Sequence, residues 1–234
     1  MDTLAHKEGV EGVNYFILGT TDVFDYGKGY ADLEYKLDTP EEVSETQFQF
    51  IENYITTCRN ALINKDLNLF TSLVDLDSFI DYFLLAEIFR NTDLAGRSVY
   101  LYLPDITSKL IYGPSWDFDY TCSRPYQLGP NQDYTLENAT DRFSHFDFWE
   151  KFLEIEGTHN LIASRYTNYI RPIVNFELEE EQRYYNFYEE YIKNNANNWY
   201  PEIEDIDALL ENNFNWTFSY FKLRMKFYDS IYLA

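Results

Sequence analysis

The spacing of apolar residues along the chain alternates between strand-like and helix-like, and it predicts an α+β fold. Short apolar runs broken by glycines over 13–37 predict a small antiparallel β ribbon. A helix is predicted from Ser44, because Ser44 and Gln47 fit a capping box and apolar residues follow at helical spacing. A second helix begins near 77–78 and ends at the Asn91 loop. It is apolar around much of its circumference, so we expect it to be central and buried.

Two further strands are predicted at 98–103 and 109–112, joined by a turn that begins at Pro104. In an antiparallel hairpin the entrance of the first strand lies beside the exit of the second. We therefore expect the residues just before the first strand and just after the second to be neighbours. From about Phe143 onward the periodicity is helical, which predicts that the hairpin packs with a largely helical C-terminal bundle.

The organisation predicted for the chain is one domain over 1–234, since the sequence contains no internal repeat, low-complexity linker or clear second core. Within it, 1–40 is a short β-rich region, 41–140 holds the helices and the hairpin, and 141–234 is the helical bundle. With 234 residues, 45% of them apolar and 19% aromatic, the chain can bury a sizeable core.

The net charge of the chain limits the classes of molecule that it can bind. A formal charge of -22, from 40 acidic and 18 basic residues, argues against nucleic acid, because phosphate backbones are bound by Lys and Arg. No apolar run approaches the roughly 18 residues of a membrane-spanning helix. The start of the chain lacks the features of a signal peptide, so we expect no export signal there. Cys58 and Cys122 are interpreted as reduced, buried thiols. The oligomeric state stays open.

Candidate chemistry gathers at the two ends of the predicted hairpin, where three carboxylates lie in an aromatic-rich setting. Asp93 is either a general base or a loop residue that caps a backbone N–H. Asp117 and Asp119 alternate along an extended segment, with Phe118 pointing to the other side. Two carboxylates on one side suit Mg²⁺ or Mn²⁺, and the alternative is a solvated strand edge.

Basic and nucleophilic residues give weaker indications of function than the aspartates do. Arg97 and Arg124 flank the aspartates and either contact phosphate oxygens or pair with the carboxylates. The histidines lack the spacing of metal ligands. The sequence contains neither a Gly-x-Ser-x-Gly elbow nor a His-Glu-x-x-His pair, so the usual support for a hydrolase is missing.

Taken together, these motifs resemble the CotH kinase family, named for the spore coat protein H, whose members look like remote relatives of protein kinases. The residues that carry the resemblance are 79–88, Asn91-x-Asp93, Tyr100-Leu101-Tyr102 and Gly113-Pro114-Ser115-Trp116-Asp117-Phe118-Asp119. The resemblance covers roughly 30–230. It implies a fold like the C-lobe of a protein-kinase-like domain and transfer of phosphate from ATP, with Mg²⁺ or Mn²⁺, to protein Ser/Thr. It also implies a bacterial spore coat, secreted or cell-surface setting and a coat or surface protein as substrate.

The same resemblance implies a role for each candidate residue. Asp93 takes the place of the catalytic-loop aspartate, and Asp117 that of the metal-binding aspartate. Ser98 stands where protein kinases have an Asn that holds a second metal ion, and Asp119 stands where they have Gly. Arg97 and Ser98 are therefore the candidate cofactor-binding residues, and Asp119 is a further candidate metal ligand.

The region before the first long helix departs from the family pattern. It holds only about 40 residues, too few for a complete nucleotide-binding lobe, and its basic residue has no clear equivalent; Lys28 and Lys36 are named as candidates. The chain is then either a piece of a longer protein or a short member that has lost full activity. The alternative function is a non-catalytic surface or assembly module whose aromatic residues bind a protein or a glycan.

Overall fold

A computed structural model describes residues 15–20, 34–39, 42, 44–91, 99–116, 118, 121–122 and 147–233. The chain divides into two compact units, Met1–Ile162 and Ala163–Ala234. The first unit combines helices with an antiparallel sheet, which confirms the predicted α+β class. The prediction of a single domain over 1–234, with its three internal regions, stays a prediction.

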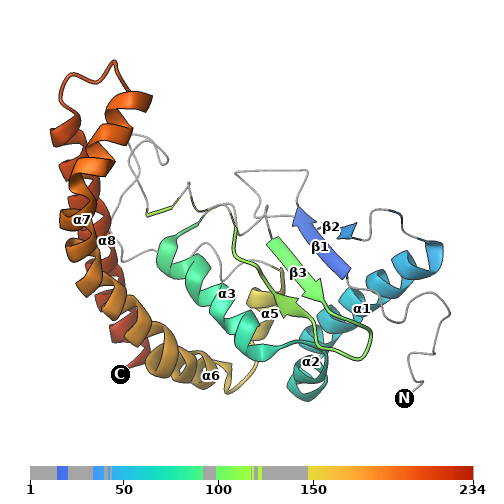
Figure 1. The fold of residues 1–234 in the computed structure, drawn as a ribbon. Coiled ribbons are helices and arrows are strands. Elements are labelled where there is room, and N and C mark those ends of the chain that lie inside the picture. The colour runs from blue at the N-terminus through green and yellow to red at the C-terminus, as the bar shows by residue number, and fades with distance from the viewer. Residues whose placement is uncertain are drawn as a thin grey trace, which may run out of the picture. The chain divides into compact units, whose positions relative to one another are not determined.

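The sheet of the first unit has four antiparallel strands in the order β2-β1-β3-β4 (Figure 1). The strands are β1 (Tyr15–Thr20), β2 (Glu34–Thr39), β3 (Val99–Leu103) and β4 (Ile111–Tyr112). The predicted ribbon, β1 with β2, and the predicted hairpin, β3 with β4, are both confirmed. They are not separate, however, because β1 also pairs along β3. Ile17 stands opposite Leu37 on one side and Leu101 on the other.

Helix α1 (Glu45–Ile63) begins as predicted. Ser44 and Gln47 form both hydrogen bonds of a capping box, at 2.9 and 3.3 Å. Its apolar residues recur at helical spacing and are buried along one face. The short helix α2 (Leu67–Leu73) was not predicted; it begins where Asp66 accepts a hydrogen bond from the Leu69 N–H at 2.9 Å.

Helix α3 (Leu76–Phe89) is the central helix that the sequence predicts, with buried residues around most of its circumference. Its first residue lies one to two positions earlier than expected, because Asp75 is the residue that caps it. The start of α3 is tied to the sheet. The Asp75 N–H donates to the Leu110 carbonyl, and the Leu110 N–H donates to the Leu73 carbonyl, both at 2.8 Å.

The core of the first unit is aromatic and is completed by α5 (Asp147–Leu153). Ring centroids of four neighbours lie within 6.0 Å of that of Phe79: Phe70, Tyr112, Trp149 and Phe152. Cys58 and Cys122 are free and buried, as predicted. Burial raises the pKa of the Cys58 thiol to about 12, so it stays protonated.

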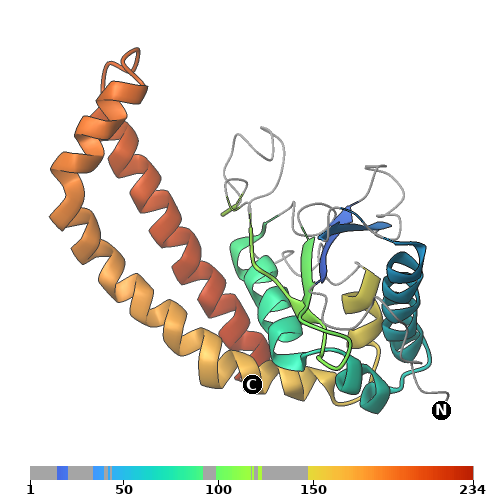
Figure 2. The same cartoon turned by 45° about the vertical axis from the view of Figure 1, so that its right-hand side comes forward.

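The second unit is helical. Helix α6 (Thr158–Arg165) crosses the boundary between the units and leads into the π-helical turn η3 (Tyr166–Ile170), α7 (Arg171–Trp199) and α8 (Ile206–Tyr232). Figure 2 shows α7 and α8 as long antiparallel helices that are joined at one end. None of the helices in the described part of the chain has the length and apolar composition to span a membrane.

Contacts at both ends hold α7 against α8. Near the α7–α8 connection, the Lys193 ammonium lies 3.1 Å from the Asp207 carboxylate. At the other end the Arg171 guanidinium donates to both carboxylate oxygens of Asp229, at 2.7 and 3.1 Å. The buried Tyr166 hydroxyl donates to the same carboxylate at 2.8 Å. This network lowers the pKa of Asp229, chiefly through its hydrogen bonds with Arg171.

Candidate functional site

The residues predicted to carry the chemistry all lie outside the described residues, so their roles stay predictions. They are Asp93, Arg97, Ser98, Asp117 and Asp119. Arg124 and Lys28 also lie outside, whereas Lys36 is in β2. The structure does describe the residues that frame these positions. The frame consists of the last turn of α3, the start of β3 and the segment that leaves β4.

The last turn of α3 is the first of the segments that frame the predicted site residues. Arg90 adopts the left-handed conformation, with φ of 47°, and its N–H donates to the carbonyls of Ala86 and Glu87. The Asn91 N–H also donates to the Ala86 carbonyl, at 3.1 Å, and Asn91 is fully buried. This arrangement ends the helix sharply. The negative end of the helix dipole therefore lies at the residue from which the chain continues to Asp93, and it favours a nearby cation.

The open end of the β3–β4 hairpin forms a second side of the frame. The Gly113 N–H donates to the Tyr100 carbonyl at 2.8 Å. The exit of β4 is thus hydrogen-bonded to the entrance of β3, which is the geometry expected from the sequence. Gly113 has φ of 128°, a conformation that residues with a Cβ rarely adopt, and it lets the chain turn as it leaves the strand.

Beyond β4 the chain returns to α3. The Phe118 ring packs edge-on against Phe89, with 5.1 Å between ring centroids. The Cys122 N–H donates to the Phe89 carbonyl at 2.8 Å, and the Thr121 hydroxyl donates to the Phe118 carbonyl at 2.9 Å. Trp116, by contrast, is 61% exposed. Phe118 therefore anchors the stretch after β4 to the end of the central helix.

Unusual backbone conformations gather at this frame. In the described part of the chain, positive φ occurs outside glycine at Lys65, Arg90 and Cys122. Arg90 and Cys122 flank the hydrogen bond between Phe89 and the returning segment. Such conformations cost about 1–3 kcal/mol each and are concentrated at functional sites.

Glu87 is a residue of the frame that sequence reasoning did not single out. Only 1% of it is exposed, and it lies one turn before Asn91 on α3. A buried carboxylate requires hydrogen bonds or an opposite charge. The signal available in the sequence was one acidic residue inside the apolar run of 83–89, which the helical pattern places on the buried face. Glu87 is thus a buried carboxylate close to the C-terminal end of α3.

Tyr82, in α3, has a raised pKa. Tyr82 is buried and stacks on Trp149 at 5.7 Å between ring centroids. Burial raises its pKa, and a hydrogen bond with the Tyr100 backbone opposes this only in part. Tyr82 therefore stays neutral at physiological pH and supports the frame by packing.

The described residues do not by themselves contain a metal centre. Among them, no group of three or more His, Cys, Asp or Glu side chains is placed to hold a metal ion. The predicted donors are two carboxylates and a hydroxyl, and hard oxygen donors of this kind are those that Mg²⁺ and Mn²⁺ prefer. The donor set named in the sequence thus fits the ion that kinase chemistry requires.

The sequence is similar to a known protein family over most of its length. The family described as CotH kinase protein matches residues 21–228, which is most of the chain. Neither the curated proteins nor the solved structures give a significant match. The matched residues include β2, β3, β4, the central helix α3, α7 and most of α8, whereas β1 precedes the match.

Proposed function

The chain belongs to the CotH kinase family, and from this premise we propose that it transfers phosphate from ATP to Ser or Thr of a protein. Family membership establishes a kinase-like domain in general. ATP, Mg²⁺ or Mn²⁺ and a protein acceptor belong to the proposal, as does a spore coat or surface setting in a bacterium.

The observation that carries this proposal is the contact between the end of α3 and the stretch after β4. Asn91 is fully buried there, and Phe118 packs on Phe89. Asp93 follows Asn91 by two positions, and Asp117 is bonded to Phe118. Because each residue extends the chain by at most about 3.6 Å, these anchors limit how far apart the two carboxylates can lie. We therefore expect Asp93 and Asp117 to share one pocket.

In the proposed reaction each residue has one task. Asp93 accepts the proton of the acceptor hydroxyl while that oxygen bonds to the γ-phosphorus and the bond to the ADP oxygen breaks. Asp117 and Asp119 hold the metal ion, with Ser98 as a weaker ligand, and Arg97 contacts phosphate oxygens. The bound ion neutralises phosphate charge. Catalysis by positioning requires all of these groups in one pocket.

The test is phosphate transfer from labelled ATP with Mn²⁺, measured as autophosphorylation and as phosphorylation of casein. We expect Asp93→Asn and Asp117→Asn to lower the rate by about 10²-fold or more, the usual effect of losing a general base or an essential ligand. Asp105→Asn is the matched control. Asp105 lies in the turn at the other end of the hairpin, where it accepts hydrogen bonds from Thr107 at 2.6 and 2.7 Å.

Two results would contradict the assignment. One is an unchanged rate in a correctly folded Asp117→Asn protein. The other is the absence of heat when the intact chain is titrated with Mg-ATP in a calorimeter, a result that favours the non-catalytic surface or assembly module. Binding that disappears in both aspartate variants and persists in Asp105→Asn supports the kinase.

A further inference from the structure

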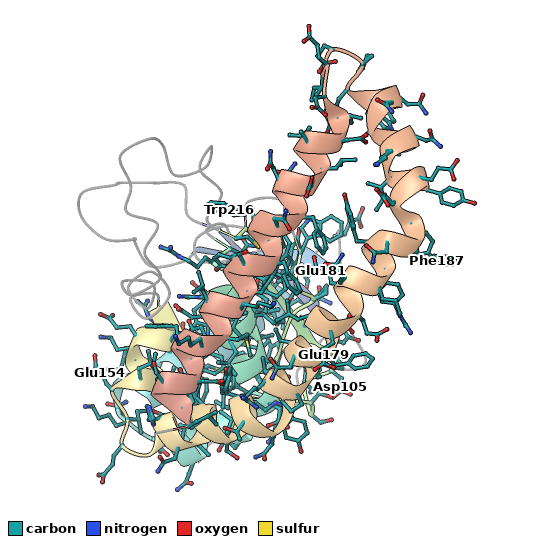
Figure 3. The ribbon with its side chains drawn as sticks, turned by 90° about the vertical axis from the view of Figure 1, so that its left-hand side faces the viewer. Asp105, Glu154, Glu179, Glu181, Phe187 and Trp216 are labelled. Atoms are coloured by element: carbon teal, nitrogen blue, oxygen red, sulfur yellow. The ribbon has the colours of Figure 1, made fainter. Side chains whose placement is uncertain are left out.

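Helix α7 has two apolar sides, and only one of them packs on α8. On the packed side, the Tyr185 ring stacks on Phe214 with 4.4 Å between centroids, and Ala196 is buried. Figure 3 shows Glu181 on the side of α7 that faces α8 and Phe187 on the side away from it. Burial raises the pKa of Glu181, in agreement with its position.

The side away from α8 carries a row of exposed apolar residues that begins in η3 and continues along α7. We call this row the outer stripe; it consists of Tyr169, Ile173, Phe176, Tyr184, Phe187, Tyr188 and Tyr191, each between 47% and 72% exposed. The spacing is three or four residues, so the side chains follow one face of the helix. Glu180 occupies the position missing from this spacing, where it pairs with Arg183.

The size of the outer stripe is that of an interface. It runs for roughly 33 Å at 1.5 Å per residue. With about 200 Å² for each large side chain, its exposed area is on the order of 800 Å². This exceeds the roughly 300–600 Å² of the largest apolar patch on a typical monomer. It equals the roughly 800 Å² that one partner buries in a standard protein–protein complex.

The charges beside the outer stripe indicate which partner fits it. Two arginines lie over rings of the stripe, Arg165 over Tyr169 and Arg183 over Tyr184, and Arg183 also pairs with Glu180. Glu177 and Glu190 flank the stripe and are exposed, and within the described part of the chain neither has an ion-pair partner. A second copy of this chain would bring the same carboxylates together, in a protein of net charge -22. Anionic lipid is repelled for the same reason. Charge complementarity therefore favours a cationic partner.

We infer that the outer stripe is a docking surface for an amphipathic helix of another protein whose apolar face is flanked by Lys or Arg. Two helices pack along their length when apolar residues recur every three to four positions on both. The aromatic rings supply apolar contact area, and Glu177 and Glu190 select basic flanks. This function is separate from phosphate transfer and does not depend on it.

The test uses a labelled synthetic peptide of about three heptads, with Leu at the apolar positions and Lys beside them. Fluorescence anisotropy should give a Kd on the order of 10 µM. The Phe187→Ala/Tyr191→Ala double variant should weaken binding about tenfold or more, because aromatic residues dominate such interfaces. Leu223→Ala removes a 55% exposed apolar side chain from α8 and should leave the Kd within about twofold.

The contribution of charge is tested separately. Glu177→Gln/Glu190→Gln should weaken binding several-fold and reduce its dependence on salt. A peptide with Glu in place of Lys should not bind. Equal binding of a scrambled Leu/Lys peptide, or unchanged binding by the Phe187→Ala/Tyr191→Ala variant, would overturn the inference. A dimer in sedimentation that this variant dissociates would also overturn it, since the occupant would then be a second copy.

Discussion

The aromatic core of the first unit and the outer stripe of the second use aromatic side chains in opposite ways. In Met1–Ile162, Phe70, Phe79 and Phe152 are at most 2% exposed and pack on one another around α3. In Ala163–Ala234, Phe187 and Tyr191 are 72% exposed. The same residue types therefore stabilise the fold in the core of the first unit and form a surface in the outer stripe. Aromatic content alone says nothing about which of these tasks a ring performs.

The largest effect on the free energy of unfolding is expected from Phe79→Ala, in the aromatic core. Removing a ring at the centre of the aromatic core leaves a cavity and should lower the free energy of unfolding by about 3–5 kcal/mol. Urea unfolding followed by circular dichroism measures it. Phe48→Ala is the control within the same unit. Phe48 is 47% exposed on α1, so its loss should change stability by no more than about 0.5 kcal/mol. Equal effects in the two variants would contradict the contrast.

An intermediate effect is expected from Tyr166→Phe, which tests the polar network of the second unit. It removes the hydroxyl that donates to Asp229 at 2.8 Å, and should lower the free energy of unfolding by about 1 kcal/mol. Tyr169→Phe is the matched control, since Tyr169 is 54% exposed. A loss as large in the control as in Tyr166→Phe would show that the hydrogen bond is unimportant.

The lowered pKa of Asp229 predicts that the stability of the protein depends on pH, and the same pair of variants tests this. Hydrogen bonds with Arg171, and to a smaller extent with Tyr166, lower the pKa of Asp229 in the folded protein. A lowered folded pKa means that this stabilisation is complete above the unfolded value of about 3.9 and is lost as the pH falls through the folded value. The difference between the intact chain and Tyr166→Phe should therefore be constant near pH 7 and shrink below about pH 4. A difference that grows in acid would contradict the network.

The smallest effect on the free energy of unfolding is expected from Phe187→Ala, in the outer stripe. Because this ring is 72% exposed, its removal should change the free energy of unfolding by no more than about 0.5 kcal/mol. The same urea titration measures it beside Phe79→Ala. A loss near that of Phe79→Ala would mean that the outer stripe supports the fold and is not a free surface.

Local features of the fold could be predicted from the sequence, and distant pairings could not. The cap formed by Ser44 and Gln47 is confirmed because a capping box depends on residues three positions apart. The start of α3 was misplaced because Asp75, Asp77 and Ser78 are all residues that cap helices well. The pairing of β1 with β3 was missed because periodicity says nothing about which distant strands meet.

In the candidate site and in the outer stripe, too, some features could be predicted from the sequence and others could not. The hairpin placed the ends of β3 and β4 together, as the Gly113 hydrogen bond confirms, while the roles of Asp93 and Asp117 stay predictions. The outer stripe was not recognised because α7 is apolar on two sides. Tyr184 and Tyr185 are neighbours in sequence, and the spacing does not say which of them faces α8.

The position of β1 between β2 and β3 has a consequence for synthesis of the chain. β2 follows β1 closely and can pair with it at once, but β3 is made only after α1, α2 and α3. At roughly 5–20 residues per second, the second edge of β1 waits for several seconds on the ribosome. An unpaired strand edge is a template for wrong pairing. The joining of β1 to β3 also closes a long loop, so we expect it to be among the slower steps of folding.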